Sequence, residues 1–305
     1  MAKSVLSAPH FQNEPAAFAY VEERLWPNGP VCPHCEETKR IGALKGQTTR
    51  PGLYKCYACK KPFTVRMGTI LESSHLPLHL WLQVIHLMCA SKKGIATRQI
   101  QRMLNCSMKT AWHLGHRIRL AMTPDSSVGP LGGAGKIVEA DETELAKSRK
   151  TKRPKGHRRR DNPVVLSLVE RGGNVRSVIL DHRGVGSHLR ALVHKDSHLV
   201  TDKAQHYKLP PFAKHSSVDH SKFEWVRGEA STNTLEGFFS IVKRGLVGVY
   251  QHVDKKHLDR YLAEFDFRQN TRERLGIDDS QRAEIALAGV KGKRLTYRRA
   301  DELKA

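Results

Sequence analysis

An amphipathic helix is predicted for residues 231–245, Ser-Thr-Asn-Thr-Leu-Glu-Gly-Phe-Phe-Ser-Ile-Val-Lys-Arg-Gly. Four apolar side chains recur at helical spacing and form the side that docks on a core: Leu235, Phe238, Phe239 and Val242. A polar residue at 231, 232 or 233 can cap the start, and Gly245 can end the helix. Glu236 and Lys243 lie about 20° apart around the axis and about two turns apart along it, so an acid and a base share one face. Alone, such a pair is typical of solvated surface, so support for a site must come from elsewhere in the chain.

The balance of charge indicates a polyanionic partner. The 305 residues include 52 Lys and Arg against 30 Asp and Glu, a formal net charge of +22. This excess favours nucleic acid first and a membrane surface second. The length and a hydrophobic content of 39% allow two or three domains with a sizeable core. The sequence has no apolar run of about 18 residues and no secretory signal, so we expect no membrane span and a location in a reducing cytoplasm.

Four of the six cysteines form two tight pairs, Cys32-Pro-His-Cys35 and Cys56-Tyr-Ala-Cys59. Two such turns let four thiolates converge on one tetrahedral ion about 2.3 Å from each sulfur. The pattern therefore predicts a zinc ribbon whose folding energy comes largely from Zn²⁺, in preference to the three disulfides that six cysteines could form. Cys89 and Cys106 lie on or beside apolar faces and are predicted to be packing groups.

A helical region is predicted after the ribbon. Apolar residues between 76 and 89 indicate a helix with a wide buried side, and two shorter helices follow at 97–104 and 109–122, separated by Asn105-Cys-Ser-Met. The pair resembles a helix-turn-helix, although any three-helix bundle in a basic protein has similar features. On the second helix, Lys109, His113 and Arg117 are the predicted DNA-binding residues.

Residues 123–136 are rich in glycine, proline and serine, which predicts a linker and a domain boundary. Strands are predicted at 137–141, 164–169 and 175–180, the last two as a hairpin, followed by a helix at 188–194, a strand at 198–202 and helices from about 232. Three antiparallel strands, a helix, another strand and then helices follow the order of a ribonuclease-H-like domain.

A basic run lies between the first two of these strands. Nine of the fourteen residues 147–160 are Lys or Arg. A solvated loop and a phosphate-binding arm are both compatible with the run, and the net charge favours the arm. The residues predicted to contact DNA there are Arg149, Lys150, Lys152, Arg153, Arg158 and Arg159, and at the end of the 231–245 helix Lys243 and Arg244.

Two acids are predicted at strand ends, Asp141 and Asp202, and strand ends are where side chains from distant sequence converge over a sheet edge. Glu236 would be the third acid. Paired magnesium ions require a shared carboxylate with others at its flanks. Pattern alone does not separate Asp141 from Glu139, which shares its strand face, and Asp202 could be an ordinary strand-end residue.

Several motifs, in order, carry a resemblance to a known family. They are the cysteine pairs, Glu139-Ala-Asp141-Glu-Thr, Val200-Thr-Asp202 followed by Tyr207, Thr232-Asn-Thr-Leu-Glu236-Gly-Phe-Phe-Ser-Ile-Val-Lys243-Arg-Gly, and Lys256-His-Leu-Asp-Arg-Tyr-Leu-Ala-Glu-Phe-Asp-Phe-Arg-Gln-Asn270. From roughly residue 15 to 275 the chain resembles bacterial insertion-sequence transposases with a zinc ribbon and a DDE catalytic domain, the ISXO type named for insertion sequence fifteen-ninety-five. Some members carry Asn in place of Glu236, so the acid here is typical of the D-D-E-K subset.

The resemblance implies a fold and an activity. The fold is mixed α+β: an N-terminal helix and zinc ribbon (1–70), a helix-turn-helix-like DNA-binding domain (71–125), a ribonuclease-H-like catalytic domain (126–275) and a basic C-terminal tail (276–305). Asp141, Asp202 and Glu236 would hold two Mg²⁺ ions, for which Mn²⁺ can substitute, in cleavage and strand transfer, with Lys243 beside the cleaved bond.

The implied partner is double-stranded DNA, as terminal inverted repeats and target, bound by a homodimer or higher oligomer on the nucleoid of a bacterial cytoplasm, with no membrane partner. Two alternatives stay open: a non-catalytic zinc-ribbon DNA-binding protein derived from a transposase, and a ribonuclease-H-like nuclease that hydrolyses without joining.

Overall fold

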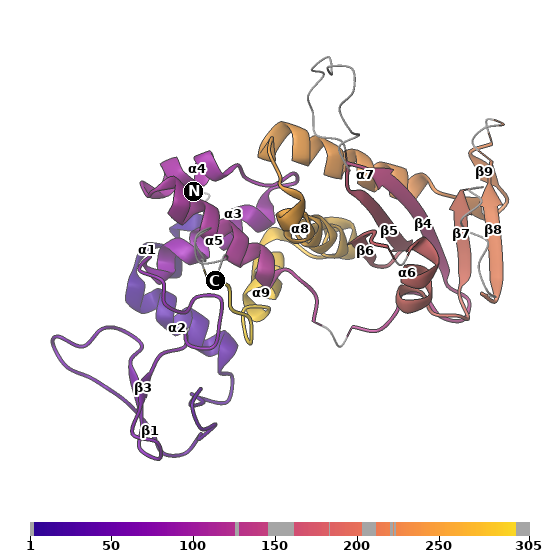
Figure 1. Cartoon of the computed structure of the whole chain (residues 1–305). Helices are drawn as coiled ribbons and strands as arrows, with labels where there is room; N and C mark the ends of the chain where they lie inside the picture. The colour runs from indigo at the N-terminus through magenta and orange to yellow at the C-terminus, as the bar shows by residue number, and fades with distance from the viewer. Residues whose placement is uncertain are drawn as a thin grey trace. The chain divides into compact units, whose positions relative to one another are not determined.

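The computed structural model describes residues 3–125, 128–145, 162–182, 184–202, 212–219, 222 and 224–296. The chain divides into two compact units, Met1–Thr123 with Gly276–Ala305 and Pro124–Leu275 (Figure 1). The predicted ribbon and helical domains, 1–70 and 71–125, both fall within the first unit. Within the described ranges, none of the helices has the length and hydropathy that a membrane crossing requires.

The first unit begins with short helices and a small sheet. Its elements are η1 (Val5–Ser7), α1 (Pro9–Gln12), α2 (Glu14–Leu25), β1 (Ile41–Ala43), β2 (Tyr54–Cys56) and β3 (Pro62–Phe63). The strands form an antiparallel sheet in the order β1-β2-β3. Only a few side chains are buried there, with Cys32, Cys56 and Phe63 at the centre. The Tyr54 hydroxyl donates a 2.8 Å hydrogen bond to Glu22 and so fastens the sheet to α2.

Three helices follow: α3 (Leu78–Ala90), α4 (Thr97–Leu104) and α5 (Met108–Ala121). The turn between α4 and α5 was predicted, and its cause is local. Asn105 takes the left-handed conformation (φ 47°) that ends α4, and Ser107 Oγ accepts a 3.1 Å hydrogen bond from Thr110 N to cap α5.

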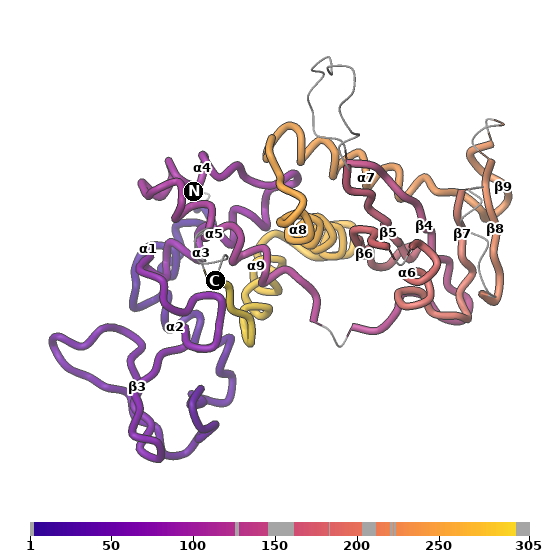
Figure 2. Tube along the Cα trace, in the orientation of Figure 1, coloured from indigo at the N-terminus to yellow at the C-terminus, as the bar shows by residue number. Residues whose placement is uncertain are grey.

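The prediction of a basic tail at 276–305 is wrong for its first part. After η6 (Glu273–Leu275), residues Asp279–Ala288 form α9, which packs against α3 in the first unit (Figure 2). Asp278 and Gln281 make a capping box at its start. At its other end a Cβ on Gly289 would lie 2.3 Å from the carbonyl oxygen of Ala121, so α9 meets the end of α5 without space for a side chain.

The second unit is built on a five-stranded sheet in the order β6-β5-β4-β7-β8, with β4 in the middle (Figure 1). Its strands are β4 (Ile137–Glu144), β5 (Val164–Glu170), β6 (Val175–Ile179), β7 (His198–Asp202) and β8 (Lys214–Val218). β4, β5 and β6 are antiparallel, whereas β7 and β8 run parallel to β4. The three-strand meander followed by a crossover is the ribonuclease-H-like order predicted, with β8 as a strand that was not predicted.

Helices cover both faces of this sheet. On one face Val165, Val169 and Val175 pack with α7 (Asn233–Gly245) and α8 (Leu258–Asn270). On the other face α6 (Gly184–Leu192) packs on the alternate residues of β4 and β5, such as Ala140 and Leu166. A small hairpin, β9 (Val226–Arg227) with β10 (Ala230–Ser231), precedes α7, and η4 (Leu246–Tyr250) and η5 (Lys255–His257) connect α7 to α8.

Three details of the predicted elements differ from the structure. Gly245 does not stop the helical path, because it keeps right-handed geometry (φ −69°, ψ −47°) and the chain continues as the π-helical turn η4. Thr232 occupies the N-cap position of α7 but makes no side-chain capping hydrogen bond. The predicted α6 range, 188–194, also lies too late, because the helix begins at Gly184.

Candidate DDE site and zinc centre

Strand register brings the first two acids together. The parallel pairing of β4 with β7 matches Ile137 with His198 and Glu139 with Val200. Continued by two residues, the same register sets Asp141 beside Asp202, the last residue of β7. The prediction that Asp141 ends its strand is wrong, because pairing with β5 carries β4 on to Glu144. The pairing of β4 with β7, in contrast, ends at Glu139, two residues before Asp141. On the side that faces β7, β4 is therefore unpaired at Asp141.

Glu236 approaches from the helix that covers this face. Leu235, Phe238 and Val242 are buried against the sheet, whereas Glu236 in the first turn of α7 is exposed. Burial, and after it the negative charges of Asp202, Glu142 and Glu236, raise the pKa of Asp141 to about 6. Lys243 and Arg244, near the end of the same helix, are also exposed.

A buried ion pair distinguishes Glu139 from Asp141. Glu139 is fully buried, and its Oε1 accepts hydrogen bonds from Arg171 Nε at 2.8 Å and Thr234 Oγ1 at 3.0 Å. Arg171 also donates to both oxygens of Ser231, just before α7. Glu139 is therefore neutralised and ties the start of α7 to β4. Sequence pattern did not reveal this role, because Arg171 is distant in sequence and sits in the β5–β6 turn.

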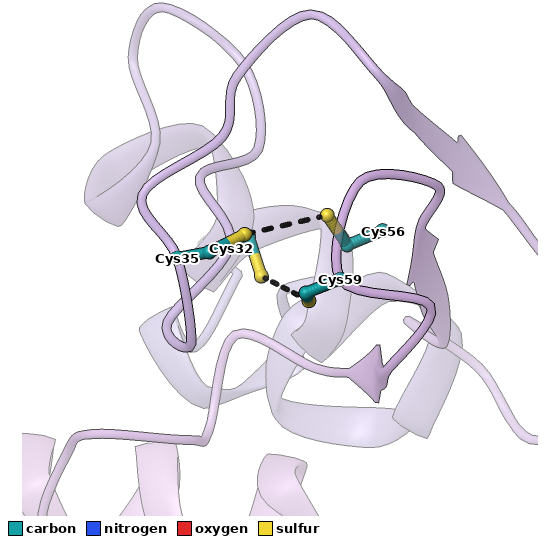
Figure 3. Close-up of side chains that lie close together, drawn as sticks. All are labelled: Cys32, Cys35, Cys56 and Cys59. Carbon is teal, nitrogen blue, oxygen red and sulfur yellow. Dashed lines mark hydrogen bonds between the residues drawn. The ribbon is translucent and has the colours of Figure 1, made fainter.

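The four paired cysteines lie together at one end of the ribbon (Figure 3). Their sulfurs all lie within 4.8 Å of one another, with Cys32 Sγ 3.7 Å from Cys59 Sγ and Cys35 Sγ 3.6 Å from Cys56 Sγ. Sulfurs at the corners of a tetrahedron about 2.3 Å from a zinc ion are separated by roughly 3.8 Å. The donor set and its spacing thus fit a structural Zn²⁺, as predicted.

The protonation of these thiols agrees with a shared cation. Hydrogen bonding from the backbone of Cys59 lowers the pKa of Cys56 to about 7. The backbone N–H of Glu37 favours the thiolate of Cys35, yet partial desolvation and hydrogen bonds with the neighbouring sulfurs raise the pKa of Cys35 to about 12. One thiolate forms readily, but its negative charge disfavours deprotonation of the next thiol. A bound cation offsets that charge and favours the thiolates. Among the described residues no other group of three or more such ligands is gathered as closely, so the three acids are spaced more widely than the thiols.

The predicted DNA-binding side chains on α5 differ in exposure. Lys109 is exposed and His113 half-buried. Arg117 is only 5% exposed, lies with its guanidinium carbon 5.0 Å from the centre of the Trp81 ring and donates to the Glu72 carbonyl. Of the three predicted DNA-binding residues on α5, Arg117 is therefore the buried one. Tyr207 and the basic run, with Arg149, Lys150, Lys152, Arg153, Arg158 and Arg159, lie outside the described residues.

A ribbon with four clustered cysteines and a mixed sheet centred on β4 are the architecture of zinc-ribbon DDE transposases. The family comparisons agree. Residues 12–62 match the transposase zinc-ribbon domain and residues 130–270 match the ISXO2-like transposase domain. Both models are of the IS1595 type, so the ribbon and the sheet domain each belong to this family of transposases.

One relative comes from a mobile element. The chain is 26% identical over 280 residues to an uncharacterized protein in transposable element ISH50 of Halobacterium salinarum. The alignment covers 85% of this chain and 92% of the relative. The similarity therefore extends over most of both chains.

Proposed function

We propose that the protein binds the terminal inverted repeats of an insertion sequence and catalyses Mg²⁺-dependent DNA cleavage and strand transfer. Two observations support this proposal: the β4–β7 register sets Asp141 beside Asp202, and the charges of Asp202 and Glu236 act on Asp141. Carboxylates that repel one another on a partly buried surface are costly unless cations neutralise them. A protein that only binds DNA has no need of such a cluster.

The oxygen donors of these three acids suit a hard cation such as Mg²⁺ or Mn²⁺. When bound, paired ions of this kind polarise a phosphodiester and activate a water or a 3′ hydroxyl for in-line attack. The chain's own contribution is to hold the three carboxylates on rigid elements, β4, β7 and α7. Lys243, two turns beyond Glu236 on an exposed part of α7, would bind a phosphate near the reacting bond.

The DNA-binding role is divided between the units. The zinc ribbon and the α4–α5 pair would bind the terminal repeats, and the basic run 147–160 would bind backbone phosphates. Because transposition joins two ends of one element, the active species would be at least a dimer.

The test is an assay of cleavage and joining on labelled duplexes that carry the element's terminal repeats. Asp141→Asn, Asp202→Asn and Glu236→Gln should each lower both products by at least about 100-fold, while repeat binding stays within a few-fold. Glu144→Gln is a matched control, because Glu144 is an exposed acid on the opposite face of β4 from Asp141. Lys243→Ala should reduce cleavage more than binding.

Three other outcomes would each overturn one part of the proposal. Full activity of Asp202→Asn would disprove the site. Cleavage without joining in the wild-type protein would identify a nuclease. Repeat binding with neither reaction, under Mg²⁺ and Mn²⁺ alike, would identify a binding protein that has lost catalysis.

A further inference from the structure

A pocket of about 440 Å³ lies beside α5 in the first unit, between that helix and the loop 73–76. Hydroxyl, imidazole and cationic side chains line it: Ser73, Ser74, His75, Lys109, Thr110, His113 and Arg117. None of the described residues that line it is acidic, so the pocket combines two permanent cations and two imidazoles with hydroxyl groups. Such a lining favours an anion that also accepts hydrogen bonds.

The wall opposite α5 is held in place by arginine and tryptophan side chains. Arg66 donates from Nε to Leu71 O at 3.2 Å and from Nη2 to Ser74 O at 2.9 Å and Leu76 O at 3.0 Å. Trp81 Nε1 donates to Ser74 Oγ at 3.1 Å. The loop is thus fixed before any ligand arrives, which lowers the entropic cost of binding.

Arg117 forms the inner part of the pocket and has unused hydrogen-bonding capacity. It is 5% exposed, and its Nη2 donates to the Glu72 carbonyl, but its Nε–H has no hydrogen-bond partner among the described residues. Burial, followed by the positive charge of nearby Arg66, lowers the pKa of Arg117 to about 10, with Glu72 opposing the shift and Arg294 adding to it. A buried guanidinium with an unpaired donor is unfavourable, and an anion in the pocket would relieve it.

We propose that this pocket binds a backbone phosphate of duplex DNA, with Arg117 as its buried anchor and Lys109 and His113 as the outer contacts. The inference rests on the proposed function only in taking DNA as the partner. It gives Arg117 a different role from base reading, because a phosphate contact fixes the position of α5 on the duplex without selecting a sequence. The pocket has more room than one phosphate requires, so an adjoining sugar can enter with it.

The Arg117 Nε–H resonance tests the proposal directly in the ¹⁵N-labelled, zinc-loaded full chain. It is assigned by its loss in Arg117→Lys or, if that variant does not fold, by through-bond correlation to its own backbone amide. Inorganic phosphate should shift the resonance in a saturable manner, and a mixed-sequence duplex without divalent cations should shift it in the same direction. No shift with either probe, or a shift with inorganic phosphate alone, would overturn the proposal.

Two charge variants make the test specific. Lys109→Gln removes an exposed pocket cation and should raise the phosphate concentration at half-saturation several-fold. Arg102→Gln removes an exposed cation of α4 that does not line the pocket and should leave that concentration unchanged. Equal effects of the two variants would show a general charge effect and contradict a defined site. Because this assay requires no catalysis, failure of strand transfer would leave its result intact.

Discussion

Glu139 and Asp141 occupy the same face of β4, but they differ in the charged groups that surround them. Glu139 is buried, forms an ion pair with Arg171 and accepts a hydrogen bond from Thr234. Asp141 is destabilised as an anion, because it is partly buried and the acids around it add negative charge. The first residue therefore contributes to stability and the second, in the absence of added cations, reduces it. This contrast leads to two predictions of opposite sign.

Glu139→Gln should destabilise the second unit by about 2–3 kcal/mol, because it leaves Arg171 without its carboxylate in a site where Arg171 is 29% exposed. Urea denaturation of the single variants and of Glu139→Gln/Arg171→Gln measures this effect. The double variant should lose less than the sum of the two single losses, since neither charge is then left unpaired. A stable but inactive Glu139→Gln protein would instead show that Glu139 is itself catalytic.

Asp141→Asn should stabilise the zinc-loaded protein in buffer without Mg²⁺. The pKa of Asp141 is raised from 3.8 to about 6 on folding, so the folded state holds this proton more tightly than the unfolded state. Wild-type stability should therefore fall as the pH rises from about 4 to 6, and the Asn variant should lack that part of the fall. At pH 8 we expect the free energy of unfolding of the Asn variant to exceed that of wild type by about 1–2 kcal/mol. This is less than the full pKa shift would give, because Asp141 is partly exposed to solvent.

Denaturation across this pH range checks the prediction, with Glu144→Gln, expected within about 0.5 kcal/mol of wild type, as the control. An Asn variant that is less stable than wild type and keeps its pH dependence would contradict the assigned electrostatics. The sequence alone could place both acids on one strand face, because side chains of a strand alternate between its two faces. It could not separate them, because the arginine that neutralises Glu139 comes from the β5–β6 turn.

At the level of elements, the sequence predicted best where the signals are local. The α4–α5 turn follows from Asn105 and Ser107, and the apolar side of α7 follows from its periodicity. β8, Lys214–Val218, lacks an apolar run, and its pairing with β7 decides its conformation. The helix α9 was missed although Asp278 and Gln281 form a capping box, because its basic surroundings favoured a tail.

Zinc removal should unfold the ribbon selectively. The strands are two or three residues long and the core has three buried side chains, so little else supports them. Cys32→Ser should lose stoichiometric zinc and the dispersed amide signals of residues 32–63, while signals of the second unit persist. Cys106→Ser is the matched control, because Cys106 lies outside the four-cysteine set and should retain zinc. A metal-free Cys32→Ser protein with unchanged ribbon signals would disprove a structural role for zinc.

At the level of the whole molecule, the first unit is discontinuous in sequence. The chain leaves it near Thr123, forms the entire sheet domain and returns at Gly276 to add α9. During synthesis the unit that carries the ribbon and the α4–α5 pair can therefore be completed only after the sheet domain has been made. A shortened product that stops after the sheet domain would contain the three acids but an incomplete first unit.

Truncation after Leu275 should accordingly destabilise the first unit and leave the second folded. It removes the Arg282 donation to Cys89 O at 2.9 Å, the Val290 carbonyl that accepts from Ile70 N at 3.2 Å and the Gly292 N–H that donates to Gly68 O at 2.9 Å, together with the buried Leu287. Limited proteolysis and amide spectra should show first-unit residues becoming cleavable and losing dispersion. Truncation after Thr296 is the control and should retain both units, because α9 and these contacts remain. If the shorter protein kept a protease-resistant first unit with its α3 signals unshifted, α9 would be an appended helix and not a part of that unit's core.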